Sequence, residues 1–172
     1  MALMKRVGKE FFKGDVLHVA ERLPGMDIVM KHGEDQVRYT ITETEAYNGM
    51  GDKACHASKG RTPRTEVMFR EGGVLYIYFV YGMHWMMNIV TGEEGNPQAV
   101  LIRGVGEVTG PGRVTKAMGI DRSFNGESLI TSPRIWIEDP GRIVSIRTGP
   151  RVGINYAGEP WISMPWRFLI NS

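Results

Sequence analysis

Short segments with a two-residue hydrophobic repeat dominate this chain of 172 residues, and short turns join most of them. Such a repeat is typical of strands that bury one face. We expect strands over residues 26–30, 37–45, 74–81, 85–91 and 99–103, with shorter ones near residues 135, 143 and 168. Strands joined by short turns pair most readily as antiparallel neighbours. The sequence therefore predicts an α+β fold, in which one domain over residues 1–172 contains a mainly antiparallel sheet.

Two short helices and one long loop accompany the strands. Asp15 can cap a helix whose apolar stripe lies within residues 16–23. The sequence "GPG" that starts at Gly110 opens a second helix over residues 113–118. Residues 48–66 form a long loop rich in glycine, lysine and arginine. Loops of this length inside a compact domain are usually functional or mobile.

The composition indicates a soluble globular protein, because 42% of the residues are hydrophobic and 23% are charged. No apolar run approaches the ~20 residues that cross a membrane, and the first residues lack the apolar core of a signal peptide. The single cysteine, Cys55, excludes an internal disulfide and fits a reducing compartment. We therefore expect a cytoplasmic protein, associated with the nucleoid if the source is bacterial, that does not contact membranes.

Positive charge is unevenly distributed, although the net charge is only +2. Residues 53–70 carry five basic side chains against Glu66, and residues 141–172 carry four arginines against Glu159. The basic residues are Lys53, Lys59, Arg61, Arg64 and Arg70 in the first segment, and Arg142, Arg147, Arg151 and Arg167 in the second. Local basic excess on a nearly neutral protein suggests that a polyanion docks on one side. Solvated loops with chance spacing would give the same pattern.

Carboxylates replace apolar residues along one face of the strand that ends in "YTITETEAYNG". Read with a two-residue period, this face carries apolar side chains up to Ile41 and then Glu43, Glu45 and Tyr47. A strand that is apolar on one side should stay apolar there until it ends. The change indicates that the strand leaves the core and lines a polar site.

Aromatic residues alternate along a second strand, "VLYIYFVYGMHWMMN", and the alternation breaks at Tyr81, just before Gly82. Aromatic packing and an ordinary turn would explain this segment. A turn that projects Tyr81 and Met83 could also act as a wedge, of the kind that enters the minor groove and replaces a base in its stack.

These features together fit an enzyme that extracts a base from DNA. A flipped base needs stacking faces, a plug for the vacated stack and cations on the phosphates. A carboxylate in the same pocket could activate a water for attack on the sugar carbon. The chain has no phosphate-binding P-loop, no complete dinucleotide fingerprint, no zinc-ligand spacing and no nucleophile elbow. We therefore expect no cofactor and no metal.

Long ordered motifs carry a family resemblance. The stretches "ITETEAYNGMGDKACHASKGRTPRTEVMF" and "GVLYIYFVYGMHWMMNIV" closely resemble the alkyladenine, or 3-methyladenine, DNA glycosylases of the mammalian type. The segments "VLIRG", "GPGRVTKAMGID", "RVGINYAGE" and "PWRFL" continue the match over nearly the whole chain. The resemblance implies a curved sheet, a monomer, and double-stranded DNA with a damaged purine as the partner.

The resemblance also implies residue roles. Glu45 corresponds to the general base, while Arg103 and the carbonyl of Val152 correspond to groups that hold the nucleophilic water. The pocket residues would be Tyr47, His56 and Tyr78, which stack on the base, and Asn88, which rejects the amino group of guanine; Tyr81 would be the wedge, with Met83 beside it. From the basic loop, we expect Arg61 and Arg64 to contact DNA as well. Without the resemblance, Asn88 could cap a turn and Val152 could belong to the core. Glu43 is expected to be a surface or supporting carboxylate.

One segment departs from the family pattern. Only residues 104–109 separate Arg103 from the "GPG" motif, where the resemblance implies a longer insertion. Two other functions remain open from the residues alone. A non-catalytic nucleic-acid-binding module would keep the wedge and the basic loops. A carbohydrate hydrolase could use Glu43 and Glu45, whose positions on one strand face lie about 6.5–7 Å apart.

Overall fold

The computed structural model describes residues 5–171, which form one connected ten-stranded sheet with three α-helices and several 3-10 turns. The strands are β1 (Lys5–Arg6), β2 (Asp27–His32), β3 (Asp35–Tyr47), β4 (Leu75–Val80), β5 (His84–Thr91), β6 (Gln98–Val105), β7 (Val108–Thr109), β8 (Ile135–Asp139), β9 (Ile146–Gly149) and β10 (Arg167–Ile170). The helices are α1 (Lys9–Phe12), α2 (Val16–Arg22) and α3 (Pro111–Met118). Every strand pair within residues 5–171 is antiparallel, which confirms the α+β prediction.

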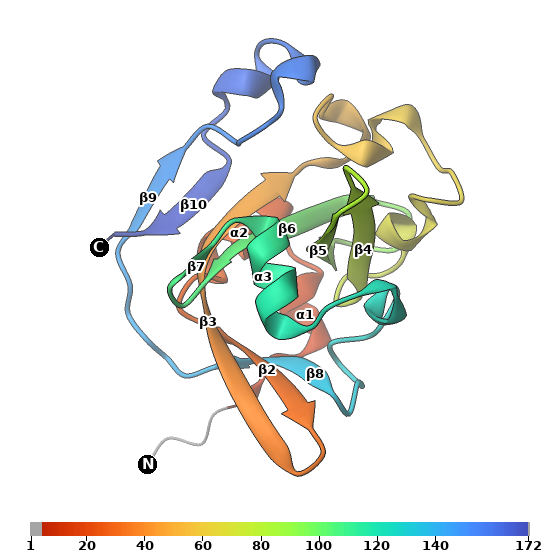
Figure 1. Ribbon diagram of the computed structural model, residues 1–172. Coiled ribbons are helices and arrows are strands. Elements are labelled where there is room, and N and C mark those ends of the chain that lie inside the picture. The colour runs from red at the N-terminus through yellow and green to blue at the C-terminus, as the bar shows by residue number, and fades with distance from the viewer. Residues whose placement is uncertain (1–4, 172) are drawn as a thin grey trace.

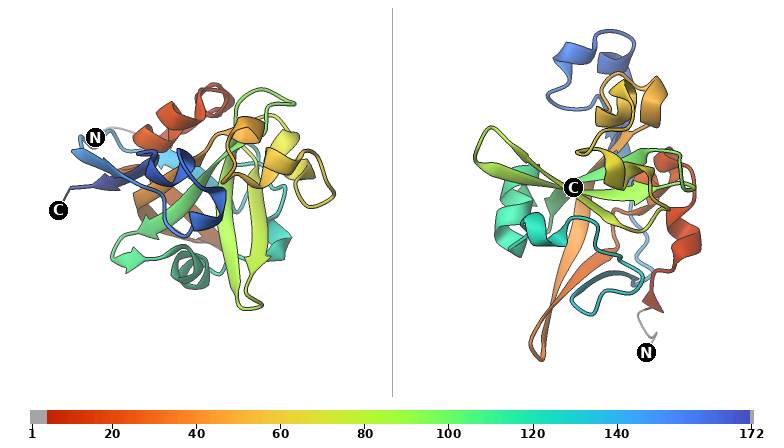
Figure 2. Two further views of the ribbon diagram at one scale, coloured as in Figure 1. Left: turned by 90° about the horizontal axis from the view of Figure 1, so that it is seen from above. Right: turned by 90° about the vertical axis from the view of Figure 1, so that its right-hand side faces the viewer.

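The long strand β3 is the centre of the sheet (Figure 1). Its first half pairs with β2, and its second half lies between β6 and β10. Helices α1 and α2 lie on one side of the sheet and α3 lies on the other (Figure 2). Asp15 caps α2 as predicted, because its side chain accepts a 2.8 Å hydrogen bond from the amide of Leu17. The largest cluster of buried apolar residues combines side chains from the sheet with those of the three helices.

The two faces of β3 have different partners. The hydroxyl of Thr44 donates to the carbonyl of Ala20 in α2, whereas the hydroxyl of Tyr39 contacts the carbonyl of Ala117 in α3. The register with β6 is irregular between Ile41 and Thr44, but both strands advance by the same number of residues there. The alternation is therefore preserved, and the carboxylates lie on the face turned away from α2, as the two-residue period predicts.

The long loop between β3 and β4 is folded into the structure by three 3-10 turns, η1 (Gly49–Gly51), η2 (His56–Lys59) and η3 (Glu66–Phe69). Its side chains form a second buried cluster with Tyr76 of β4 and residues of β5 and β6. The cluster consists of Cys55, Ala57, Val67, Met68, Phe69, Tyr76, Val90 and Ala99. The loop therefore covers one face of the sheet.

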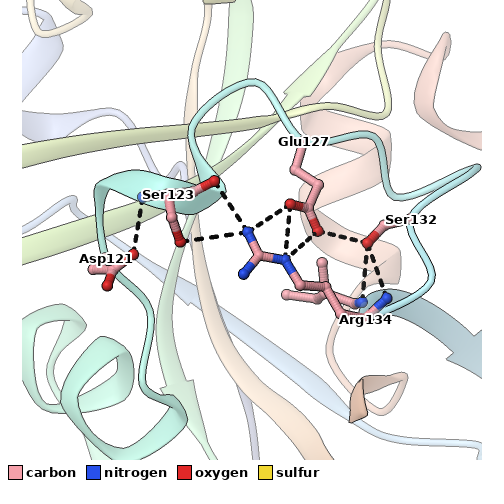
Figure 3. A network of polar contacts seen from close by, with 6 residues as sticks. Asp121, Ser123, Glu127, Ser132 and Arg134 are labelled. Carbon is pink, nitrogen blue, oxygen red and sulfur yellow. Dashed lines mark hydrogen bonds and ion pairs between the residues drawn. The ribbon is translucent and has the colours of Figure 1, made fainter. Parts of the chain in front are cut away.

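A polar network orders the segment between α3 and β8 (Figure 3). The guanidinium of Arg134 donates to the carboxylate of Glu127 at 2.7–2.9 Å and to the carbonyl of Ser123 at 3.0 Å. The ordered segment covers the edge of β4, where the side chain of Asn125 accepts a 2.9 Å hydrogen bond from the amide of Ile77. The network thus supports the hairpin formed by β4 and β5.

The C-terminal arm, residues 146–171, folds back onto the end of β3 (Figure 1). The connection between its strands β9 and β10 contains two 3-10 turns, η5 (Asn155–Ala157) and η6 (Trp161–Ser163). The predicted strand near residue 143 is wrong, because Ile143 is fully exposed and β9 starts three residues later. None of the helices in residues 5–171 is long and apolar enough to cross a membrane.

Candidate active site

Glu45 is fully buried near the end of β3, and both of its carboxylate oxygens are hydrogen-bonded. Its Oε1 accepts a 2.9 Å bond from the hydroxyl of Tyr47, and its Oε2 accepts a 2.6 Å bond from the backbone amide of Val152. The Nε of Arg103 lies 3.7 Å from the same Oε2. The structure therefore brings together the three residues expected to carry the chemistry, although the contact from Val152 is made by its amide.

Opposing influences act on the pKa of Glu45. Burial raises the pKa above the usual value of a glutamate, and this is the largest effect. The positive charge of Arg103, the amide of Val152 and the hydroxyl of Tyr47 lower the pKa again, because each favours the ionised carboxylate. The net result is a raised pKa, the direction that is common for general bases.

Glu43 is a supporting carboxylate and not a surface one, since only 7% of the residue is exposed. Its Oε2 accepts a 2.8 Å hydrogen bond from Nε of Arg103 and lies 3.5 Å from the guanidinium of Arg167. Arg103 itself lies within the irregular register between β3 and β6. Glu43 thus anchors the arginine that approaches Glu45.

A pocket lined by aromatic residues opens beside Glu45. The strand register places Glu45 of β3, Leu101 of β6, Asn88 of β5 and Tyr76 of β4 next to one another across four strands. The pocket is partly open to solvent and is lined by Tyr47, Ala54, Cys55, His56, Met68, Tyr76, Tyr78, Asn88, Ala99 and Tyr156. All four residues expected to bind the base line this pocket.

The side chains in the pocket hold one another in place. The rings of His56 and Tyr78 meet edge to face at 4.5 Å, and Nδ1 of His56 lies 3.2 Å from the hydroxyl of Tyr76. The amide of Asn88 donates a 3.2 Å bond to the carbonyl of Tyr76. Asn88 lies in the middle of β5, which excludes the alternative that it caps a turn.

Burial keeps the ionisable groups of the pocket neutral near pH 7. It raises the pKa of Tyr76 to about 12 and that of Tyr78 still further. Burial, followed by the positive charge of Arg64, lowers the pKa of His56 to about 4. A neutral imidazole can present one donor and one acceptor to a base.

A basic hollow adjoins the pocket and shares its residues Ala54, Cys55, His56 and Tyr156. Lys53, Lys59 and Arg64 line this hollow, and the guanidinium of Arg64 lies 5.4 Å from the ring centre of Tyr78. Arg61, the other arginine expected to bind DNA, forms an exposed 2.6 Å ion pair with Glu66. Arg64 is therefore placed at the pocket, whereas Arg61 is already paired.

The hairpin of β4 and β5 carries Tyr81 at its tip. The amide of Met83 donates to the carbonyl of Val80, and Tyr81 and Gly82 have φ angles of 53° and 63°. Two positive φ angles define a type I′ turn, which favours Asn or Gly. A tyrosine there is strained, and 87% of it is exposed, as is 69% of Met83. Strain of this kind is concentrated at functional sites.

Three of the four C-terminal arginines are already bonded within the protein, whereas Arg147 is exposed. Arg151 is 4% exposed and pairs with Asp52, while Arg142 pairs with Asp27 and Arg167 donates to the carbonyl of Pro150. Local patterns give no signal for such contacts, because Asp52 and Arg151 are 99 positions apart. Val152, which the sequence leaves open as a core residue, is instead 48% exposed.

Comparisons with known proteins point to one family. The family model for methylpurine-DNA glycosylase (MPG) matches residues 10–109 and 106–172. A protein of Desulfitobacterium hafniense named "Putative 3-methyladenine DNA glycosylase" is 42% identical over 97% of this chain and 96% of its own length. Proteins with the same name from Methanocella arvoryzae and Borreliella burgdorferi are 39% and 40% identical, each over 93% of this chain.

The family match divides at residues 106–109, where the turn between β6 and β7 lies. This turn takes the place of the insertion that the resemblance implies after Arg103. With this short connection, Arg103 is in contact with Glu43 and Glu45. With matches that cover nearly all of its length, the chain belongs to the methylpurine-DNA glycosylase family.

Proposed function

We propose that this protein is a monofunctional DNA glycosylase of base excision repair. It flips a damaged purine out of double-stranded DNA and hydrolyses the N-glycosidic bond with a water that Glu45 activates, leaving an abasic site. The protein acts as a monomer and needs no cofactor.

The observation that carries the proposal is the position of the Glu45 carboxylate. It is fully buried, fixed by two donors and 3.7 Å from Arg103, and the aromatic pocket begins at the ring of Tyr47. A base within the pocket would bring its sugar carbon toward this carboxylate. Arg103 and the carbonyl of Val152 orient the attacking water in this proposal: Arg103 lies 3.7 Å from the carboxylate that accepts its proton, and Val152 is held beside the same carboxylate through its amide.

The pocket suits purines that are either positively charged or altered at their edges. Cationic lesions such as 3-methyladenine and 7-methylguanine leave readily, so they need only a fitted pocket and an activated water. Neutral lesions such as hypoxanthine and ethenoadenine also need protonation of the leaving base. Asn88 excludes guanine that carries its amino group. The side chain of Asn88 is fixed by its hydrogen bond to the carbonyl of Tyr76, so it does not move aside to make room for that group.

Water, and not an amine, is the nucleophile in this proposal. The described residues that line the base pocket include no lysine, whereas Lys53 and Lys59 line the outer hollow. Without an amine at the sugar carbon, no covalent imine forms and no strand cleavage follows.

The two other candidate functions fit the site less well. A carbohydrate hydrolase would need Glu43 as a second catalytic carboxylate, and Glu43 is already bonded to Arg103. A non-catalytic DNA-binding module would not need a buried carboxylate with two donors, which is costly to maintain.

One assay panel tests the proposal. The protein is incubated with methylated DNA and with duplexes that carry one hypoxanthine or one ethenoadenine, and free base and abasic sites are measured. The proposal predicts release of free base, abasic sites that break only on alkaline treatment, and no covalent complex on borohydride reduction. Binding without release of base would favour the non-catalytic module, and a borohydride-trapped complex would exclude water as the nucleophile.

A further inference from the structure

Arg151 joins three separate parts of the chain inside the protein. Its guanidinium forms an ion pair with Asp52 at 2.6 and 3.0 Å and donates a 3.0 Å bond to the carbonyl of Ala46. Ala46 belongs to β3, Asp52 to the loop that follows β3, and Arg151 to the C-terminal arm. The arm is therefore fixed to the end of β3 beside the candidate base.

The same guanidinium stacks between two aromatic rings. Its central carbon lies 4.9 Å from the ring centre of Tyr47 and 4.9 Å from that of Trp166. Tyr47 lines the base pocket, and its hydroxyl donates to Glu45. The ring that would stack on the flipped base is thus supported by a buried cation.

Both donors to Glu45 adjoin this arginine. Tyr47 is held through its ring, and the amide of Val152 belongs to the next residue of the chain. When the guanidinium shifts, the ring of Tyr47 and the backbone at Val152 are both free to move. A displacement of about 1 Å at a catalytic group can cost about 10²-fold in rate.

We propose that Arg151 is a positioning residue for hydrolysis: it holds Tyr47 and the amide of Val152 against the carboxylate of Glu45. This inference rests on the proposed function, because it names a residue that supports the same reaction. A purely structural role would make Arg151 one more buried ion pair that fixes the arm without affecting Glu45 specifically.

A second ion pair of similar geometry provides a control, in which the arginine side chain is 42% exposed and that of Arg151 is fully buried. Arg142 donates to the buried Asp27 at 2.7 and 3.2 Å and to the carbonyl of Gly25 at 3.0 Å. The distances are close to those that Arg151 makes with Asp52 and Ala46. The partners of Arg142 are Gly25, Asp27 and Thr40, none of which belongs to the candidate active site.

The experiment compares Arg151→Lys with Arg142→Lys. Lysine keeps the charge and removes the planar stack and the paired donors. With enzyme in excess over a single-lesion duplex, Arg151→Lys should slow excision at least about tenfold after correction for the folded fraction, while Arg142→Lys stays within twofold. If Arg151→Lys is too unstable, the charge-balanced variant Asp52→Asn/Arg151→Gln replaces it, with Asp27→Asn/Arg142→Gln as its control.

Two further readouts separate positioning from a loss of structure. The first is a double-mutant cycle with Tyr47→Phe: if Arg151 acts through the hydroxyl of Tyr47, the combined loss is smaller than the product of the two single losses. The second is the pH profile, since weaker donors to Glu45 move its acid limb to higher pH. The charged and titratable groups around Glu45 are Glu43, Tyr47, Tyr78, Arg103, Arg151, Tyr156 and Arg167, and Arg151→Lys leaves all the others in place.

The outcomes are distinct. If the unaltered protein releases no base from any lesion, the proposed function itself fails. If it is active and a folded Arg151 variant keeps its rate, Arg151 has no positioning role and the inference is wrong. The inference is also wrong if the losses of the Arg151 variant and of Tyr47→Phe simply multiply in the double mutant and the pH profile is unchanged.

Discussion

The hydroxyl of Tyr47 donates a 2.9 Å hydrogen bond to Oε1 of Glu45, so one side chain contributes both to the wall of the base pocket and to the support of the candidate base. The ring and the hydroxyl can be separated by mutation. A stack on the base needs only the ring, whereas the carboxylate needs only the hydroxyl.

Tyr47→Phe should therefore slow excision while leaving base flipping nearly unchanged. We expect a loss of about threefold to tenfold, because one hydrogen bond to a charged group contributes roughly 1.5 kcal/mol or less when it is only partly lost. The acid limb of the rate profile should move to higher pH, since the hydroxyl lowers the pKa of Glu45. Single-turnover rates measured between pH 5 and pH 8 test this, with Tyr78→Phe as the control because its hydroxyl is not bonded to Glu45.

Glu45→Gln should retain DNA binding and lower excision by at least ~10²-fold, the low end for loss of a general base. Glu43→Gln should give an intermediate loss of about tenfold, because Arg103 would lose a 2.8 Å charged contact close to the candidate base. The sequence alone suggests a smaller effect for Glu43. Single-turnover excision measures both variants, and a rate within threefold of the unaltered protein for Glu45→Gln would remove it from the role of base.

Replacing Tyr81 should make the protein more stable and less active. Tyr81→Asn replaces a tyrosine at a φ of 53° with a residue that type I′ turns favour, which removes backbone strain. We therefore expect a gain of about 1 kcal/mol in the free energy of unfolding. The fraction of flipped lesion should fall about tenfold or more, because stacking of one aromatic ring contributes roughly 1–3 kcal/mol. Urea unfolding measures the first effect, and a fluorescent base beside the lesion measures the second.

The control for the wedge is the opposing base. The loss in Tyr81→Asn should shrink when the lesion lies opposite a mismatch, whose extrusion is already easier. An unchanged fluorescence signal together with slower excision would place Tyr81 in the pocket or the fold and contradict its role as a wedge.

Arg64 and Arg61 should differ in their contribution to DNA affinity. Arg64→Gln should reduce the slope of log affinity against log salt by about 0.9, the value for one phosphate contact. Arg61→Gln should change the slope less, because the charge of Arg61 is already paired with Glu66 at 2.6 Å. Titrations of undamaged duplex over a range of salt concentrations give both slopes, and equal slopes for the two variants would show that the ion pair opens on binding.

His56 should make stability depend on pH. Its pKa in the folded protein is about 4, below the ordinary value of 6.5, so folding favours the neutral imidazole. The resulting stability is fully present above pH 6.5 and is lost as the pH falls toward 4, by up to about 3 kcal/mol. Chemical denaturation from pH 7.5 to pH 4 tests this against His56→Gln, which should lack that part of the decline. Parallel stability curves for the two proteins would contradict the lowered pKa.

Local patterns predict the strands well, because the two-residue hydrophobic repeat within each strand indicates which of its faces is buried. The alternation along β3 and the cap at Asp15 are both local, and both agree with the structure. The strand near residue 143 fails because apolar residues there are not preceded or followed by a regular repeat, and the chain passes over the surface before β9.

The site is less predictable, because its support comes from distant residues. Glu45 stands out in the sequence as a carboxylate on an apolar face, but its donors include an amide more than a hundred positions away. The bond between Arg103 and Glu43 and the pairing of Arg151 with Asp52 likewise join segments far apart. Clustering of arginines in the sequence does not reveal which of them are buried.

The contact between Glu45 and Val152 has a consequence for the order in which the protein is made. The strand with the carboxylate is synthesised early, and its backbone donor belongs to the part of the C-terminal arm that follows β9. A nascent chain that has reached residue 149 already contains the segments of the wedge and most of the pocket wall, but the carboxylate has no amide to fix it. In the proposed mechanism, the capacity for hydrolysis is therefore acquired late in translation, after the segments that would recognise damage have been synthesised.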